Sequence, residues 1–325
     1  MKIRAKNAGV HVHSRNVILW ITTIFVLVWG GFQFWPVTIQ IHGSIPEESF
    51  SIRMPLRDKK RLDFLFREVC FMNVWAYTLM GSKPESVDQY KKPWAAFRDQ
   101  IKHPDFWDIV HLCFWPPHFK RIQYFLNPHE IRMKLGWETL NKYFRYFPDS
   151  IFALNTYVRD DDIVGFSVTN KVQFIKTVKQ HLEDFQGILQ QQAIEPEDLA
   201  DNAKLRAFMK CLTHNGLSGT VLGYGRDNAW LYRKYYDSPE EWPMISAWPE
   251  EEIVNLDQLN ERTMAFQSWQ LEDLFYPRFA CDPNSEETKE LKRIYREERE
   301  KIIQYFQGKD LVEAALNLFN QKLSL

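Results

Sequence analysis

The 325-residue chain lacks the sequence signatures of the familiar catalytic and cofactor sites. No Gly-Lys-Ser/Thr phosphate loop follows its glycines, and no Cys-x-x-Cys pair is present for zinc. His129-Glu130 begins like a metalloprotease helix, but Met133 stands where the second zinc-binding histidine is required. Asp160 begins a stretch like a calcium loop, but Lys171 stands where the loop needs a glutamate. The sequence therefore indicates no metal site and predicts no cofactor.

Cysteine is scarce, and the four that occur stand far apart, at Cys70, Cys113, Cys211 and Cys281. In an oxidising compartment they could form one or two disulfides, which the sequence alone cannot pair. The alternative, which we favour, is that they are buried free thiols. Aromatic residues are plentiful, at 15% of the chain. They indicate either aromatic-lined grooves or, more commonly, a well-filled core.

The chain has no excess of positive charge. It carries 41 Lys and Arg against 42 Asp and Glu, and the segment before the first acidic residue, Glu47, holds only basic charges. The remainder is therefore net acidic. A protein that binds nucleic acid is expected to present a basic face, so this balance argues against a nucleic acid partner. The length suffices for one large domain or two small ones with a real core.

Charge of either sign is absent from Asn16 to Pro46. Within this stretch the apolar run from Val17 to Trp35 would be about 28 Å long as a helix, which is close to the thickness of a bilayer's hydrocarbon core. We therefore expect a transmembrane anchor at residues 17–36. The tail of residues 1–16 is basic, and positive flanks stay in the cytoplasm. The bulk of the chain is then expected outside the cytoplasm.

The apolar run has two alternatives to a membrane anchor. A positive start followed by an apolar run also fits a cleaved signal peptide. However, the run ends in bulky aromatics, Phe32, Phe34 and Trp35, where a cleavage site needs small residues. A buried core helix is the second alternative, although a run of this length without charge is unusual for one. We favour the uncleaved anchor.

The segment after the anchor is predicted to be an extended stalk, residues 37–57. Val37, Ile39 and Ile41 alternate with polar residues, as in a strand. The exported domain, residues 58–325, follows it and contains no internal repeat and no low-complexity tract.

Helical periodicity marks most of the exported domain. Its first helix is predicted to run from Asp58 to about Met80, where Gly81 and Pro84 end it. Further helices are expected at residues 86–100, 104–114, 128–146, 172–189, 196–212, 217–237, 284–307 and 310–322.

One segment has the pattern of strands instead. Phe152 to Val158 and Ile163 to Thr169 are rich in β-branched and aromatic residues. They predict an antiparallel β-hairpin, with Asp160 and Asp161 exposed at its turn. The expected fold class is therefore α+β and mostly helical: an N-terminal single transmembrane helix, then a helical domain with a small antiparallel β-hairpin or sheet.

A cluster of glycines stands out between positions 216 and 225. Glycine costs about 1 kcal/mol in a helix interior, so the cluster in a predicted helix requires a reason. The structural explanation is close packing of helices through small residues. The functional explanation is a binding site in which Tyr224, Arg226 and Asn228 project from a helix start toward an anionic or amide ligand.

A second glycine patch, Gly81-Ser82-Lys83-Pro84, lies at the end of the first predicted helix. Its structural explanation is a helix cap with a solvated lysine beside the negative helix end. Its functional explanation makes Lys83 a contact for an anion. We hypothesise that Lys83, Tyr224, Arg226 and Asn228 line one ligand-binding groove.

The two patches resemble Gly-x-Lys-Pro and Leu-Gly-Tyr-Gly-Arg-x-Asn motifs of a family of uncharacterised membrane-anchored proteins from chlamydia-related bacteria. The motifs stand here at Gly81 to Pro84 and at Leu222 to Asn228, and the predicted hairpin fits the same layout. The resemblance covers most of residues 58–237. It implies a bacterial envelope setting, with the exported domain on the periplasmic side of the inner membrane, and it implies no particular activity.

Three hypotheses of function follow. The first is a single-pass membrane-anchored protein whose extracytoplasmic domain binds a protein partner or a ligand in the envelope. The second is a membrane-anchored enzyme of unknown reaction with a site near Lys83 and Arg226. The third is a structural or scaffolding subunit that uses the two C-terminal helices. The absence of a recognisable nucleophile, metal site or acid–base pair favours the first.

Overall fold

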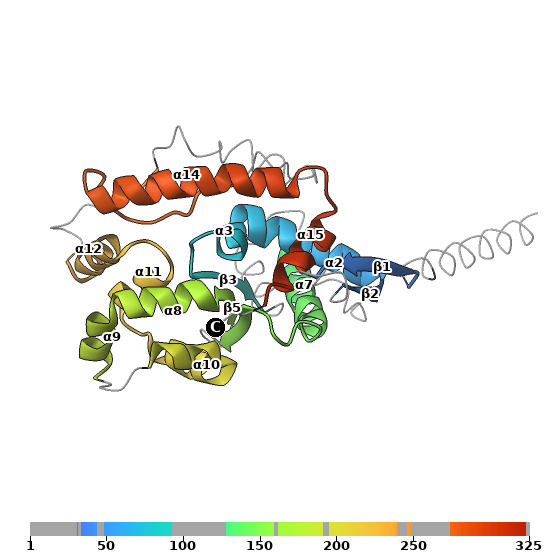
Figure 1. The fold of residues 1–325 in the computed structure, drawn as a ribbon, viewed down its shortest axis with the longest axis horizontal. Coiled ribbons are helices and arrows are strands. Elements are labelled where there is room, and N and C mark those ends of the chain that lie inside the picture. Colours follow the sequence, from blue (N-terminus) through green and yellow to red (C-terminus); the bar gives the residue numbers. More distant parts are fainter. Residues whose placement is uncertain are drawn as a thin grey trace, which may run out of the picture.

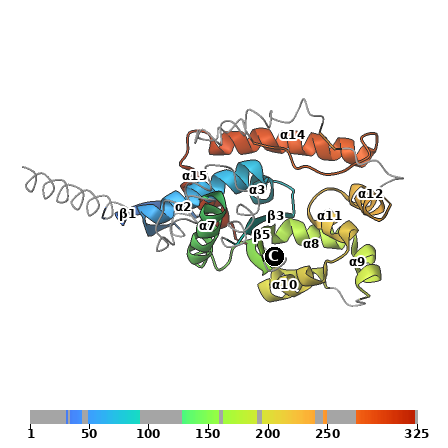
Figure 2. The same cartoon turned by 180° about the vertical axis from the view of Figure 1, so that it is seen from behind.

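The computed structural model describes residues 31, 34–43, 49–92, 128–158, 162–190, 195–238, 246–248 and 274–322. Within these residues helices and strands are mixed, and the strands form two separate sheets. Figure 1 shows the longest of the described helices, α14 (Glu286–Phe306), lying across the other elements, and Figure 2 shows the same arrangement from behind.

The first sheet is a hairpin of β1 (Pro36–Ile41) and β2 (Phe50–Pro55), which pair antiparallel. Successive side chains of a strand point to opposite faces, so every second residue is available for burial. The buried residues are Ile39, Ile41, Ile52 and Met54. Their burial shows that the segment predicted as an extended stalk packs on the domain. The hairpin needs this packing, because an isolated two-stranded hairpin is barely stable in water.

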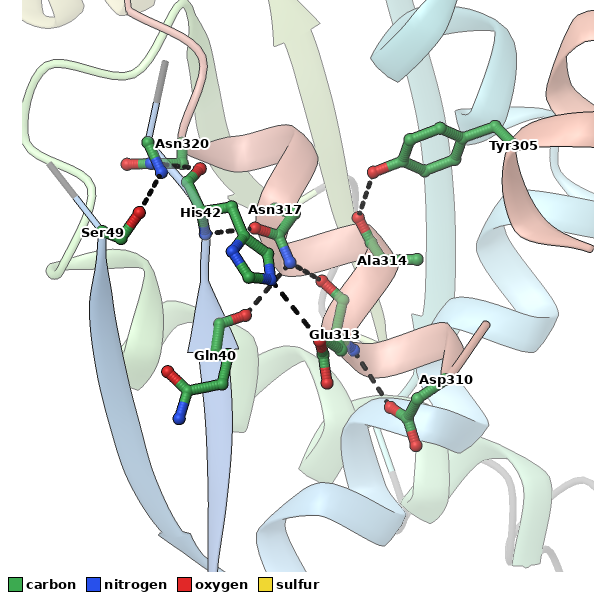
Figure 3. Close-up of polar contacts among 10 residues, drawn as sticks. Gln40, His42, Ser49, Tyr305, Asp310, Glu313, Ala314, Asn317 and Asn320 are labelled. Carbon is green, nitrogen blue, oxygen red and sulfur yellow. Dashed lines mark hydrogen bonds and ion pairs between the residues drawn. The ribbon is translucent and has the colours of Figure 1, made fainter. Parts of the chain in front are cut away.

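Helix α15 (Leu311–Phe319) fastens this hairpin to the domain (Figure 3). The amide oxygen of Asn317 accepts the backbone N–H of His42 at 2.6 Å, and its amide nitrogen donates to the carbonyl of Gln40 at 3.1 Å. In the same helix Phe319 is fully buried, with its ring centroid 5.6 Å from that of Phe152 in the second sheet. Helix α15 thus connects the two sheets.

The first predicted helix is present but interrupted. It consists of α2 (Leu56–Phe66), a π-helical stretch η2 (Arg67–Met72) and α3 (Trp75–Met80). The interruption is at Val74, whose φ of 60° lies in the left-handed region that β-branched residues avoid. Beside it the amide of Asn73 donates to Asp88 at 2.6 Å. This contact holds the break against the second sheet.

The second sheet has the strand order β3–β5–β4 with antiparallel neighbours. Strands β4 (Phe152–Val158) and β5 (Ile163–Asn170) form the predicted hairpin, which is confirmed, with Val158 opposite Val164. Asp160 and Asp161, expected at its turn, lie outside the described residues.

The third strand of this sheet corrects the helix predicted at 86–100. Residues Glu85–Lys91 form β3, which pairs with the other side of β5 and places Tyr90 opposite Val164. The backbone hydrogen bonds of this ladder come from a strand more than seventy residues away along the chain. The spacing of apolar residues within a short segment does not indicate whether a distant strand will pair with it. Residues 93–100, and the helix predicted at 104–114, lie outside the described residues.

The remaining helices follow the predicted positions, but three are divided. The breaks fall at His181, at Asp201 and between Val221 and Arg226. The elements are α7 (Pro128–Phe144), α8 (Lys171–Gln180), α9 (Leu182–Leu189), the 3-10 helix η3 (Pro196–Ala200), α10 (Asn202–Cys211), α11 (Asn215–Val221) and α12 (Arg226–Asp237), besides α14 and α15.

Two hydrophobic cores support these elements. The larger one is built from the β1–β2 hairpin, α2, α3, α7, α14, α15 and the inner side chains of the second sheet. The smaller one lies among α8, α9, α10 and α11, with Phe174, Phe185 and Leu205 fully buried. Cys70 and Cys281 are buried free thiols, as expected, whereas Cys211 is exposed and Cys113 lies outside the described residues.

The predicted fold class and the predicted membrane character require a correction. None of the helices in the described ranges is both long enough and apolar enough to cross a bilayer. Pro36, expected as the end of a transmembrane helix, is instead the first residue of β1. The tail of residues 1–16 and most of the predicted span, residues 17–30, 32 and 33, lie outside the described part of the chain. What the structure describes is a mixed helix and sheet fold with two sheets.

Candidate functional site

The two glycine patches lie side by side beneath α14, which packs on α3 at one point and on α12 at another (Figures 1 and 2). Two glutamates of this helix hold the two turns. Glu298 accepts the backbone N–H of Ser82 at 2.7 Å. Glu287 accepts those of Asp227 at 3.2 Å and Asn228 at 3.0 Å, and so caps the first turn of α12.

The glycines make room for these carboxylates. A β-carbon on residue 225 would stand 2.5 Å from the carboxyl carbon of Glu287, and the φ of Gly225 is +83°. A β-carbon on Gly81 would overlap the carboxylate of Glu298 in the same way. Close approach through small residues, the structural explanation given for the 216–225 cluster, is therefore present there, and Gly81 of the second patch also permits a close approach.

Lys83, between these turns, is buried. Its side chain is only 1% exposed, and its Nζ donates to the carbonyl of Leu222. The same Nζ lies 4.8 Å from the centroid of the Tyr224 ring, a cation–π contact. Lys83 makes no ion pair with any residue that the structure describes. A solvated lysine, expected for a simple helix cap, is therefore not what this position holds.

Burial also changes the protonation of this lysine. It lowers the pKa of Lys83 from 10.5 to about 7, while the charge of Glu85 acts in the opposite direction. Glu85 is buried as well, and burial raises the pKa of its carboxyl against the effects of Ser167 and of Lys83. The two groups are not within ion-pair distance in the described structure. Both are therefore desolvated with hydrogen bonds to neutral groups, Lys83 to Leu222 and Glu85 to Ser167 and Thr169, but without an ion pair.

Lys83 lines a cavity of about 350 Å³. Tyr224 and Arg278 line it too, together with Tyr276, whose ring stacks on that of Trp248 at 4.1 Å between centroids. The remaining lining residues are Met72, Asn73, Val74, Ser86, Val87, Leu222 and Phe275.

Arg278 brings a second positive charge to this cavity. It is exposed, its guanidinium lies 5.0 Å from the centroid of the Phe275 ring, and it forms no ion pair within the described ranges. Its segment is fixed, because the backbone N–H of Phe275 donates to the carbonyl of Phe71 at 3.0 Å. Arg278 was not predicted from the sequence, where its only signal is its place among aromatic residues.

Arg226 lies in a neighbouring cavity of about 290 Å³, which Lys83 does not line. Its Nε and Nη2 donate to the two carboxylate oxygens of Asp184 at 2.6 and 3.1 Å. This hydrogen bond lowers the pKa of Asp184 below its ordinary value. The guanidinium is thus already engaged by a carboxylate, in a bidentate pair.

Asn228 is buried and bonded at both ends of its amide. Its Nδ2 donates to the carbonyl of Tyr224 at 3.1 Å, and its Oδ1 accepts from Thr288 Oγ1 at 3.0 Å and from the backbone N–H of Asp282 at 3.3 Å. The structure therefore brings Lys83 and Tyr224 together, keeps Arg226 in a separate cavity and uses Asn228 to join α12 to α14.

A larger cavity, of about 550 Å³, lies beside α15 in the region of Figure 3. Its acidic groups already have partners: Asp310 pairs with Lys59 at 2.6 Å, and Glu313 lies 4.0 Å from His42. Asn317 is used in fastening β1. Lys309 also lines this larger cavity, but it is exposed and lies over the ring of Tyr305, 3.8 Å from its centroid. The cavity of Lys83 and Arg278 instead has a buried cation without an ion pair to any described residue, and we take it as the candidate site.

Comparisons of this chain with protein-family models, with curated proteins and with solved structures gave no match. The family resemblance expected from the glycine patches and the extracytoplasmic location therefore stay predictions.

Proposed function

We propose that this chain is a binding protein for a small organic anion, held in the cavity between Lys83 and Arg278. The observation that carries the proposal is the burial of Lys83 at the wall of a cavity, without an ion pair to any described residue. An unpaired buried charge is costly, and a bound anion would offset that cost.

The rest of the cavity suits the same ligand class. Arg278 offers a planar fork of donors that fits a carboxylate, sulfonate or phosphate. Tyr224 and Tyr276 offer flat apolar walls, and the stacking of Tyr276 on Trp248 holds one of these walls in place. The cations would fix the charged group of the ligand, and the rings would contact its organic part.

The rival hypothesis is that Lys83 only ties the 222–225 turn to β3 through its bond to Leu222. The two hypotheses differ in what they require of Arg278. A purely structural lysine gives Arg278 no function, whereas an anion site uses both cations. Arg278 is therefore the residue to change first.

The test is calorimetric titration at pH 6 with benzenesulfonate, whose charge does not change between pH 5 and pH 9. We expect Arg278→Ala to weaken binding at least tenfold, because a hydrogen bond to a charged group contributes about 1.5–3 kcal/mol. Stability should change little, since Arg278 is exposed. Lys83→Met should weaken binding at the same pH.

The matched control is Arg206→Ala. Arg206 is an exposed arginine of α10, and it has no hydrogen bond or ion pair to described residues. The Arg206→Ala variant should bind benzenesulfonate with the same affinity as the unmodified chain. Failure of the unmodified chain to bind, or equal affinities of the Arg278 and Arg206 variants, would rule the proposal out.

A further inference from the structure

A second cavity, also of about 350 Å³, adjoins the candidate site. The two cavities share three lining residues, Leu222, Tyr224 and Arg278. Lys83 lines only the first of them. The other lining residues of the second cavity include Ser218, Asn228, Tyr232, Phe279 and Ala280.

The walls of this second cavity are mostly apolar. Tyr224 and Phe279 stack with ring centroids 5.7 Å apart and planes at 19°. Together with Tyr232 and Ala280 they form a surface of rings and methyl groups. No Lys, Asp or Glu lines it among the described residues, and Arg278 at the shared boundary is its one lining residue with a charge.

Two of its polar lining residues have their hydrogen bonds satisfied elsewhere. Asn228 uses its amide to contact Tyr224, Thr288 and Asp282. The hydroxyl of Ser218 donates to the carbonyl of Leu212 at 2.9 Å. Asn215 and the hydroxyls of Tyr224 and Tyr232 are its other uncharged polar side-chain groups, so a polar ligand would find few partners here, whereas an apolar group would meet mainly rings and methyl groups.

We infer that the anion is amphipathic, with its charged head between Lys83 and Arg278 and an alkyl or aryl tail in the second cavity. This inference rests on the proposed function and names the class of ligand. Arg278 then lies at the junction of head and tail. Its aliphatic stem can contact the tail while its guanidinium holds the head.

The experiment is a series of alkyl sulfonates titrated into the full chain below their micellar concentrations: methane-, butane- and octanesulfonate, with octanol as the uncharged control. Affinity should rise with chain length by up to about fourfold per methylene, the equivalent of about 0.8 kcal/mol for each CH₂ buried. Octanol should bind more weakly than octanesulfonate. Ala280→Leu, which fills the second cavity, should reduce the gain with chain length and leave methanesulfonate binding unchanged.

The outcomes separate the two ideas. If all sulfonates bind alike and Arg278→Ala still weakens them, the anion site stands and the tail site is wrong. If octanol binds as well as octanesulfonate, or Ala280→Leu keeps the full chain-length gain, the tail lies elsewhere and the inference fails. A measurement that needs no variant is the nuclear Overhauser contact between the terminal methyl of octanesulfonate and the ring protons of Tyr232 or Phe279. Absence of that contact at saturation would also overturn the inference.

Discussion

The carboxylate of Glu287 occupies the space that a β-carbon of residue 225 would need. That β-carbon would stand 2.5 Å from the carboxyl carbon and from one of its oxygens. From this position Glu287 accepts the N–H groups of Asp227 and Asn228 at the start of α12. Gly225, whose φ is +83°, thus leaves room for the Glu287 carboxylate to cap α12, and the turn that it shapes also carries Tyr224 to the cavity of Lys83.

Gly225→Ala should destabilise the fold by about 2–4 kcal/mol. The estimate combines about 1–3 kcal/mol for the strained backbone with about 1 kcal/mol for the disturbed cap. Urea unfolding would measure it. The control is Gly187→Ala in α9, where an added methyl group meets nothing within 4 Å. That variant should gain about 0.5–1 kcal/mol from helix propensity. Equal effects of the two changes would contradict this account of Gly225.

Arg226→Ala should lower stability modestly, by about 0.5–1 kcal/mol at neutral pH, and leave benzenesulfonate binding intact. The Arg226–Asp184 pair has good geometry, but its side chains are 41% and 24% exposed, so solvent screens it. The pair lowers the folded-state pKa of Asp184. Its contribution is therefore present above the unfolded pKa of about 3.8 and is lost as pH falls through the folded value.

Unfolding of the Arg226 variant and the unmodified chain across pH 2 to 7 would check this, with Asp184→Asn completing a double-mutant cycle. Arg233→Ala, which removes the exposed pair with Asp237, is the matched control. Loss of anion binding in Arg226→Ala, with stability retained, would instead restore Arg226 to the binding site.

The stability difference between the unmodified chain and Lys83→Met should depend on pH. Burial lowers the folded-state pKa of Lys83 to about 7, below the unfolded value of 10.5. Between these values the unfolded chain binds a proton that the folded chain does not, so the stability of the unmodified chain relative to the variant rises with pH from about 7 to 10.5. It is lost as pH falls back to about 7 and changes no further below 7 or above 10.5. The change should amount to about 2–3 kcal/mol between pH 7 and pH 9.5. A flat difference in urea unfolding over this range would show that Lys83 titrates normally.

Thiol reactivity should follow burial. In a Cys113→Ser background, Cys211 should react with Ellman's reagent in the folded chain, because it is exposed. Cys70 and Cys281 should react only after unfolding, since burial hides their thiols and raises their pKa. Two or more fast-reacting thiols in the folded chain would contradict the packing of the core around Cys70 or Cys281.

Local patterns in the sequence determined the elements whose partners are near in the chain. The β4–β5 hairpin could be predicted because alternation and a short acidic turn specify both strands within twenty residues. The start of α7 at Pro128 and the end of α14 before Gly308 follow from capping chemistry within one helical turn. The two glycine patches were also visible as unusual, because glycine is costly in a helix.

Features that depend on partners distant in the chain became visible only in the three-dimensional structure. Strand β3 forms because its backbone pairs with the edge of β5. The segment predicted as a stalk is a packed hairpin, and α15 holds it through the bond between Asn317 and His42. Lys83 is buried beside Leu222, which is 139 residues away in sequence, and Arg226 pairs with Asp184, which is 42 residues away. The hydrogen bonds, the burial and the pKa of a side chain all depend on the groups that surround that side chain in space. The periodicity of the sequence does not indicate which groups those are.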